Sequence, residues 1–228
     1  MRMKQHRNIL LFLGSLLILA IISLFFIKKE GFIDFFDENN KKIDTQAMEK
    51  EEQDDAEKFI QPTDCVLELG ARYGTVSAII NKKLLKPTNH IAVEPDEDVW
   101  NALEKNKQNS QSYFRILRGI ISNKKFSLQK SGYGTNQIES DLSNLPHFTF
   151  KQVQDMVDTP FTALVADCEG CIEHFFKENE EILKTLRIIM LEEDFPEKCN
   201  YNSVKELLKK HSFKEVKQGF HCVWTRNV

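Results

Sequence analysis

The stretch Cys65-Val66-Leu67-Glu68-Leu69-Gly70-Ala71-Arg72-Tyr73-Gly74 decides the fold. Its first five residues form a short apolar run that predicts a buried β-strand, and residues 75–85 predict a helix. A strand, a turn with glycines and a helix are the arrangement of a nucleotide-binding turn. Gly70 would let the chain turn sharply, and Gly74 would let the helix start pack closely. The G-x-x-x-G spacing disfavours a pyrophosphate, and hence NAD, because a pyrophosphate requires the denser G-x-G-x-x-G pattern.

Strand and helix patterns alternate from this stretch to the end of the chain. We expect further strands at 89–93, 113–117, 161–166 and 186–191, and helices at 96–109, 169–183 and 201–211. Two last strands, 213–216 and 220–224, have no helix between them and predict an antiparallel edge. The pattern therefore predicts an α/β, Rossmann-like domain with a mostly parallel seven-stranded sheet covered on both faces.

The segment between the third and fourth of these strands is polar. A small extra strand is expected at 125–129, and residues 130–147 are rich in Gly, Ser, Asn and Asp and predict a long loop. An acceptor-binding lid and a disordered insertion are both compatible with this composition.

Acidic residues end the first two strands or lie close to their ends. Glu94 ends the second strand, twenty residues after Gly74, where Rossmann-like folds bind ribose hydroxyls. Glu68 precedes the first glycine and suits a cationic group such as the ammonium of an amino acid. Both lie near the carboxyl ends of neighbouring strands, where α/β sheets bind ligands. A ribose at one end and an ammonium at the other describe S-adenosylmethionine as the cofactor.

At this point the sequence resembles the FkbM-type methyltransferases. The resemblance rests on a D/E-x-G-A-x-x-G turn, an F-E-P second strand and a strand ending in D-x-E-G. The corresponding stretches here are residues 68–74, Val93-Glu94-Pro95 and Ala166-Asp167-Cys168-Glu169-Gly170. Arg72 replaces a frequent Asn, and Cys168 replaces a small or aliphatic residue. The resemblance covers about residues 60–225.

The resemblance implies a class I methyltransferase fold, S-adenosylmethionine as methyl donor, and usually O-methylation of a hydroxyl. The acceptor would be a sugar, a glycan or a small molecule. The residues expected to bind the cofactor are Glu68, Gly70, Ala71, Gly74, Glu94, Pro95, Gly119 and Ile120. Gly119 and Ile120 are included because the stretch after the third strand runs near the adenine ring in this fold.

Two acidic residues follow the predicted central strand 161–166. Asp167 would point at the crevice beside the methyl donor, where it could position the substrate or act as a general base. Glu169 is the second catalytic candidate. As an alternative, Asp167 only caps the following helix and Glu169 only interacts favourably with the helix dipole. Three acids at 192–194 end the next strand, but solvated acids are common there and no metal is predicted.

The five cysteines do not predict a disulfide framework. Cys168 and Cys171 form a C-x-x-C pair, which leaves open a thiol oxidoreductase as an alternative function. A second alternative is a catalytically inactive, methyltransferase-like interaction module at a membrane. The presence of Glu68, Gly70, Gly74 and Glu94 argues against the inactive module.

The N-terminal part of the chain predicts a membrane anchor. Residues 1–8 form a basic tail, and residues 9–27 are free of charge and would rise about 28 Å as a helix, close to the thickness of a bilayer core. The main alternative is a cleaved signal peptide, which the absence of a small-x-small site after Ile27 disfavours.

Three flanking cations before this segment and two after it slightly favour a single-pass orientation with a cytoplasmic N-terminus. Residues 28–58, with eleven acidic and six basic side chains, predict a charged stalk ahead of a domain spanning 59–228. Within the stalk, the apolar side chains of Phe32, Ile33, Phe35 and Phe36 are expected at the membrane interface, where aromatic rings are favoured. The net charge of −3 gives no sign of nucleic-acid binding, and the oligomeric state stays open.

Overall fold

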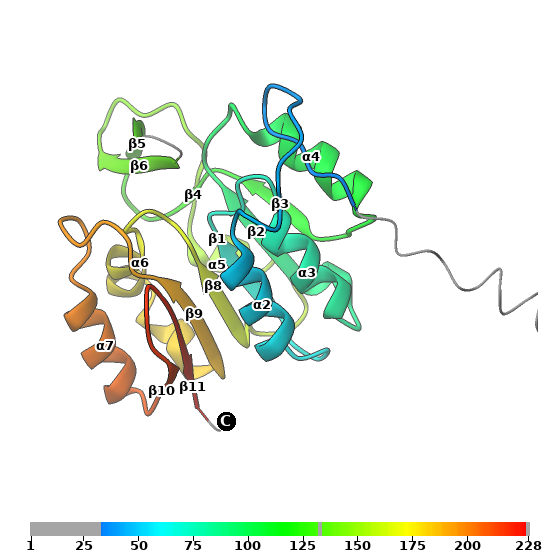
Figure 1. Ribbon diagram of the computed structural model, residues 1–228. Helices are drawn as coiled ribbons and strands as arrows, with labels where there is room; N and C mark the ends of the chain where they lie inside the picture. Colours follow the sequence, from blue (N-terminus) through cyan, green and yellow to red (C-terminus); the bar gives the residue numbers. More distant parts are fainter. Residues whose placement is uncertain (1–32, 132–133, 227–228) are drawn as a thin grey trace, which may run out of the picture. The chain divides into compact units, whose positions relative to one another are not determined.

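The main sheet is described by a computed structural model, which covers residues 33–131 and 134–226. Within these residues, seven strands form one sheet in the order β10-β11-β9-β8-β1-β2-β3 (Figure 1). Their bounds are β1 (Val66–Leu69), β2 (His90–Glu94), β3 (Arg115–Arg118), β8 (Ala163–Ala166), β9 (Ile188–Glu192), β10 (Lys214–Lys217) and β11 (His221–Thr225). Five adjacent strands of this sheet are parallel, namely β9, β8, β1, β2 and β3. β11 runs antiparallel to β9, and β10 runs antiparallel to β11. The predicted sheet, including its antiparallel C-terminal edge, is confirmed.

Helices cover both faces of the sheet (Figure 1). They are α2 (Lys50–Phe59), α3 (Thr75–Lys83), α4 (Trp100–Asn109), α5 (Phe150–Gln154), α6 (Ile172–Glu178) and α7 (Tyr201–Lys210), with short 3₁₀ turns η1 (Pro87–Asn89) and η2 (Glu180–Lys184). The side chains of β1 alternate between the two faces of the sheet. Leu67 and Leu69 pack in the cluster that contains α6 and α7, whereas Val66 packs with α2 and α3. Glu68 therefore lies on the α3 side of the sheet.

Two helices begin later than predicted. α4 begins at Trp100 instead of residue 96, and Asp96 does not cap it, because its side chain accepts from the Asp98 N–H in the preceding turn. α6 begins at Ile172 instead of residue 169. Glu169 and Gly170 have φ values of 55° and 84°, and these left-handed conformations cannot continue a right-handed helix.

The predicted loop at 130–147 is largely structured, which corrects that interpretation. β5 (Phe126–Ser131) and β6 (Gly134–Glu139) form an antiparallel hairpin, and β4 (Ile120–Ile121) pairs with β7 (His147–Phe148). Polar residues occupy much of β6, so the sequence lacks the alternation of a half-buried strand. The hairpin is held by its own ladder and lies apart from the main sheet (Figure 1).

The sequence predicts that the domain begins at residue 59, whereas the compact unit begins at Asp34. Phe35 is buried with Ile43 in a cluster with residues of α3 and α4, not placed at a membrane interface. The buried amide of Asn106 accepts from the Phe36 N–H (2.9 Å) and donates to the Phe36 carbonyl (2.8 Å) and the Tyr73 carbonyl (2.9 Å). The segment before β1 is thus part of the domain.

The predicted tail 1–8 and span 9–27 lie outside the described residues. In the part of the chain that is described, no helix has the length and apolar character needed to cross a bilayer.

Candidate functional site

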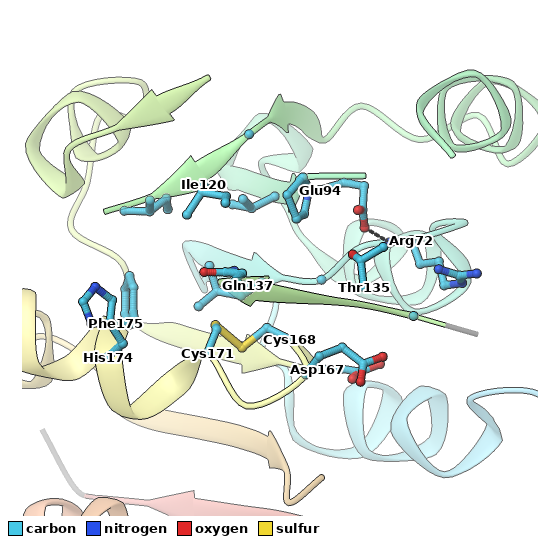
Figure 2. A pocket seen from close by; sticks show the side chains of 18 residues that line it. Arg72, Glu94, Ile120, Thr135, Gln137, Asp167, Cys168, Cys171, His174 and Phe175 are labelled. Atoms are coloured by element: carbon cyan, nitrogen blue, oxygen red, sulfur yellow. Dashed lines mark hydrogen bonds between the residues drawn. A yellow bond between two sulfur atoms is a disulfide. The ribbon is translucent and has the colours of Figure 1, made fainter. Parts of the chain in front are cut away.

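A cleft of about 750 Å³, partly open to solvent, lies at the carboxyl ends of β1, β2 and β8 (Figure 2). This is the position where open α/β sheets bind ligands. Its lining includes seven residues predicted as site residues, namely Gly70, Glu94, Pro95, Gly119, Ile120, Asp167 and Glu169. The structure thus brings together most of the residues that the sequence analysis selected.

The turn after β1 requires a glycine at its first position. Gly70 has φ 90°, and a Cβ there would lie 1.6 Å from the backbone oxygen of Asp167. The N–H groups of Gly70 and Ala71 both donate to the Val93 carbonyl at 3.0 Å. The ends of β1, β2 and β8 can therefore approach one another only because residue 70 has no side chain.

Ala71 and Gly74 support the turn without lining the cleft. Ala71 is buried, and Gly74 begins α3 with φ 77° in close contact with Leu103. Both were expected to bind the cofactor, but neither is among the residues that line the cleft.

Glu94 is held at the cleft by two backbone donors. Its carboxylate accepts from the Arg72 N–H and the Asp96 N–H, both at 2.7 Å (Figure 2). Burial raises the pKa of Glu94 to about 7, in spite of these two hydrogen bonds, which lower it. Each carboxylate oxygen has a second lone-pair direction, so Glu94 can accept two further hydrogen bonds from a ligand.

Glu68 does not line this cleft. It is 2% exposed, the Ser77 hydroxyl donates to its Oε2 at 2.6 Å, and Nε2 of His90 lies 2.9 Å from the same oxygen. Glu68 borders a smaller cavity of about 250 Å³ together with Asp167. The predicted contact with the cofactor's ammonium group has no counterpart in the geometry of the main cleft.

Asp167 lies at the junction between the cleft and a cluster of acids, and it does not cap α6, whose N-cap is Cys171. Carboxylate oxygens of Asp167, Glu52 and Glu192 lie within 4.8 Å of one another. Burial raises the pKa of Asp167 well above its ordinary range, and its hydrogen bond with Glu192 and the charge of Glu192 raise it further. Burial also raises the pKa of Glu52 to about 10 and that of Glu192 to about 7. Near neutral pH the acids therefore retain protons among them.

Such a group of oxygens could also hold a metal ion. Among the described residues, a second group has ligand atoms equally close to one another, namely Glu193, Glu215 and Cys222. Protonated carboxyl groups account for the close approach of the three acids without a cation, and the absence of a metal stays a prediction.

Glu169 contacts the hairpin across the cleft. A Cβ on Gly134 of β6 would lie 1.8 Å from its carboxylate Oε1, so Gly134 makes room for this side chain. Burial and the neighbouring charge of Asp194 together raise the pKa of Glu169 to about 7. Glu169 is thus held between the β8 end and the hairpin, which makes it a residue that closes the cleft wall.

Several lining residues were missed by the sequence analysis. They are Arg72, Ile121, Gly134, Thr135, Gln137, His174 and Phe175, together with the predicted strand-end residues Leu69 and Val93. Cys168 and Cys171, the C-x-x-C pair noted in the sequence, also line the cleft. Figure 2 shows Thr135 and Gln137 on β6 and His174 and Phe175 on α6. His174 lines the cleft, and its Nε2 lies 3.1 Å from Oε1 of Glu178. The sequence pointed to β6 only indirectly, because the predicted polar loop that contains it was considered as an acceptor-binding segment.

Comparison with known proteins gives similarities of fold only. No family model matches the chain, and no curated protein sequence matches it. Solved structures similar to it include an rRNA methylase from Streptococcus thermophilus (TM-score 0.48, 11% identity, 76% of this chain and 93% of that one). Others are a precorrin-6y C5,15-methyltransferase from Geobacter metallireducens (TM-score 0.48, 11% identity, 82% and 90%) and a putative O-methyltransferase from Klebsiella pneumoniae (TM-score 0.44, 9% identity, 81% and 78%). TM-scores below 0.5 at such identities do not establish what this chain binds or does.

Proposed function

We propose that the protein is an S-adenosylmethionine-dependent methyltransferase that methylates a hydroxyl of a sugar, glycan or small molecule. The observation that carries the proposal is the position of Glu94. A buried carboxylate ends β2, lines the cleft and keeps acceptor capacity for two ribose hydroxyls. The resemblance to FkbM-type enzymes supports the hydroxyl as acceptor.

The bound cofactor would supply an electrophilic methyl group on a sulfonium. The chain's own residues then have two tasks. The turn at Gly70 and the carboxylate of Glu94 orient the donor, and the surrounding walls limit the access of water. Asp167 follows β8 and lines the cleft, and its ionised carboxylate would accept the proton of an attacking hydroxyl.

The charge of the site disfavours a polyanionic acceptor. The carboxyl groups of Asp167 and Glu169 line the cleft, and the chain has a net charge of −3. A phosphate backbone requires positive surface to replace its counterions. We therefore propose a neutral or cationic acceptor and no nucleic acid.

Calorimetry on the full-length chain with S-adenosylhomocysteine tests the cofactor assignment. We expect one site with a Kd in the micromolar range, equivalent to about −8 kcal/mol, and no binding of NAD. Because residues 34–58 pack on the domain, a shortened chain starting near residue 59 would be unsuitable. Absence of binding by a folded chain would favour the inactive, methyltransferase-like module.

We further propose that residues 9–27 anchor the protein in a membrane, because they form an uncharged run long enough to span a bilayer. After carbonate extraction of cells, full-length protein is expected in the membrane pellet. Recovery of the full-length chain in the soluble fraction would contradict the anchor. A mature form beginning near residue 28 would support a cleaved signal peptide instead.

A further inference from the structure

Two of the five cysteines lie in the cleft wall and are joined to each other. Cys168 and Cys171 form a disulfide with a Cα–Cα distance of 5.4 Å, and both line the cleft (Figure 2). The other three cysteines are free and buried. Burial raises the pKa of Cys65 to about 11 and that of Cys222 to about 12, so these thiols are poor nucleophiles. Only the Cys168–Cys171 pair combines partial exposure with a partner sulfur among the described residues.

The disulfide encloses the two left-handed residues that end the β8 turn. Glu169 has φ 55° and Gly170 has φ 84°, and a non-glycine residue rarely adopts the left-handed region. Glu169 is also the side chain that contacts Gly134 on the hairpin. Because the covalent ring closes over residues 168–171, it restrains the backbone that places Glu169 against β6.

We propose that Cys168 and Cys171 are a thiol–disulfide exchange site whose oxidised form holds the cleft in its binding conformation. The inferred effect on cofactor binding rests on the proposed function, whereas the exchange reaction itself does not. The partner would be a dithiol reductant, which requires access from the cleft.

The exchange proceeds in two displacements. A thiolate of the reductant attacks one protein sulfur, the Sγ–Sγ bond breaks, and a mixed disulfide forms while the other protein sulfur leaves as a thiolate and takes up a proton. The second thiol of the reductant then displaces the first protein sulfur. The protein gains two electrons and two protons as a dithiol, and the reductant leaves as its cyclic disulfide.

Reduction would remove the covalent restraint on Glu169. Its backbone could return to the right-handed region that the residue ordinarily prefers, and its carboxylate would then leave Gly134. The wall between the β8 end and β6 would lose a contact that helps to define the cleft. We expect the reduced protein to bind the cofactor product more weakly, by about tenfold.

The experiment compares the full-length protein equilibrated with oxidised or reduced dithiothreitol. Differential alkylation followed by peptide mass spectrometry should place the disulfide at Cys168 and Cys171 in the oxidised sample and two alkylated thiols there in the reduced one. Calorimetry with S-adenosylhomocysteine on both samples gives the affinity ratio. Circular dichroism confirms that both samples are folded.

Two variants sharpen the comparison. The double variant C168S/C171S should bind like the reduced wild type and show no response to the redox buffer. Cys65→Ala, which removes a buried thiol away from the cleft, should retain the full wild-type response.

Failure to form the disulfide in the oxidising buffer would overturn the exchange site. Equal affinities of a mapped disulfide form and a mapped dithiol form would overturn the control of binding and leave the proposed function intact. Absence of binding in both forms would overturn the proposed function, and with it the inferred control of the cleft. If the double variant does not fold, the two redox forms of the wild type decide the matter by themselves.

Discussion

Replacing Asp167 by Asn is expected to lower turnover by about 10²–10⁴-fold with little change in cofactor affinity. The side chain lines the cleft directly after β8, and its carboxylate can accept a proton when it is ionised. Asn keeps the size of Asp but cannot take up a proton. Labelled methyl transfer to an acceptor found by screening sugars and glycans measures the effect.

The control for this substitution is Asp158→Asn, the same chemical change at an exposed residue paired with Lys86. It should leave turnover unchanged. Parallel loss of cofactor affinity in Asp167→Asn would assign Asp167 to cofactor binding instead. Activity near that of the wild type would remove Asp167 from the catalytic step.

The neighbouring acid provides a test that a merely structural role would not satisfy. Because Glu192 raises the pKa of Asp167, turnover should increase with pH as Asp167 loses its proton. Glu192→Gln removes the charge that disfavours ionisation, so the rising limb of the pH profile should move to lower pH. A pH profile that this substitution leaves unchanged would show that Glu192 does not affect the ionisation on which turnover depends.

Replacing Glu94 by Ala should weaken the binding of S-adenosylmethionine by roughly 30- to 1000-fold, or about 2–4 kcal/mol. Two charge-assisted hydrogen bonds to the ribose would be lost. The substitution also leaves the N–H groups of Arg72 and Asp96 without their acceptor, so the turn itself is expected to lose stability. Calorimetry must therefore be accompanied by thermal unfolding of the variant.

The matched control is Glu97→Ala, which removes an exposed carboxylate from the same segment and should bind like the wild type. The pH dependence gives a second criterion. With a pKa of about 7, Glu94 is ionised above that pH, so the affinity should rise as the pH increases through 7 and then level off. This increase should be absent in Glu94→Ala. Wild-type affinity in a folded variant would remove the ribose assignment.

The sequence predicted the sheet well because its strands are short apolar runs that alternate with helices. It could not predict that residues 34–58 pack on the domain, since Ile43 is isolated among charged neighbours and the apolar residues around Phe35 suit a membrane interface equally well. Their burial depends on α3 and α4, which are distant in sequence. Of the β5–β6 hairpin, the first strand was expected at 125–129, whereas β6 lies within the predicted loop at 130–147. The two strands of the hairpin pair with each other and do not join the main sheet, so polar composition alone suggested a loop.

The position of Glu68 shows where a strand-end argument needs the side-chain alternation as well. The residue lies near the carboxyl end of β1, as predicted, but successive side chains point to opposite faces. Leu67 and Leu69 occupy the α6 side, and Glu68 therefore meets Ser77 and His90 on the other side. The pattern of the strand contained this information, whereas the spacing of the motif did not.

The order of the strands also affects how the chain can fold during synthesis. β1 hydrogen-bonds to β2 on one side and to β8 on the other, and the paired starts of β1 and β8 are 97 residues apart in sequence. At about 5–20 residues per second, the ribosome needs roughly 5–20 s to make the intervening chain. For that time one edge of the central apolar strand has no native partner. Because unpaired edges are prone to aggregation, we expect the emerging N-terminal half to be the stage most dependent on chaperones.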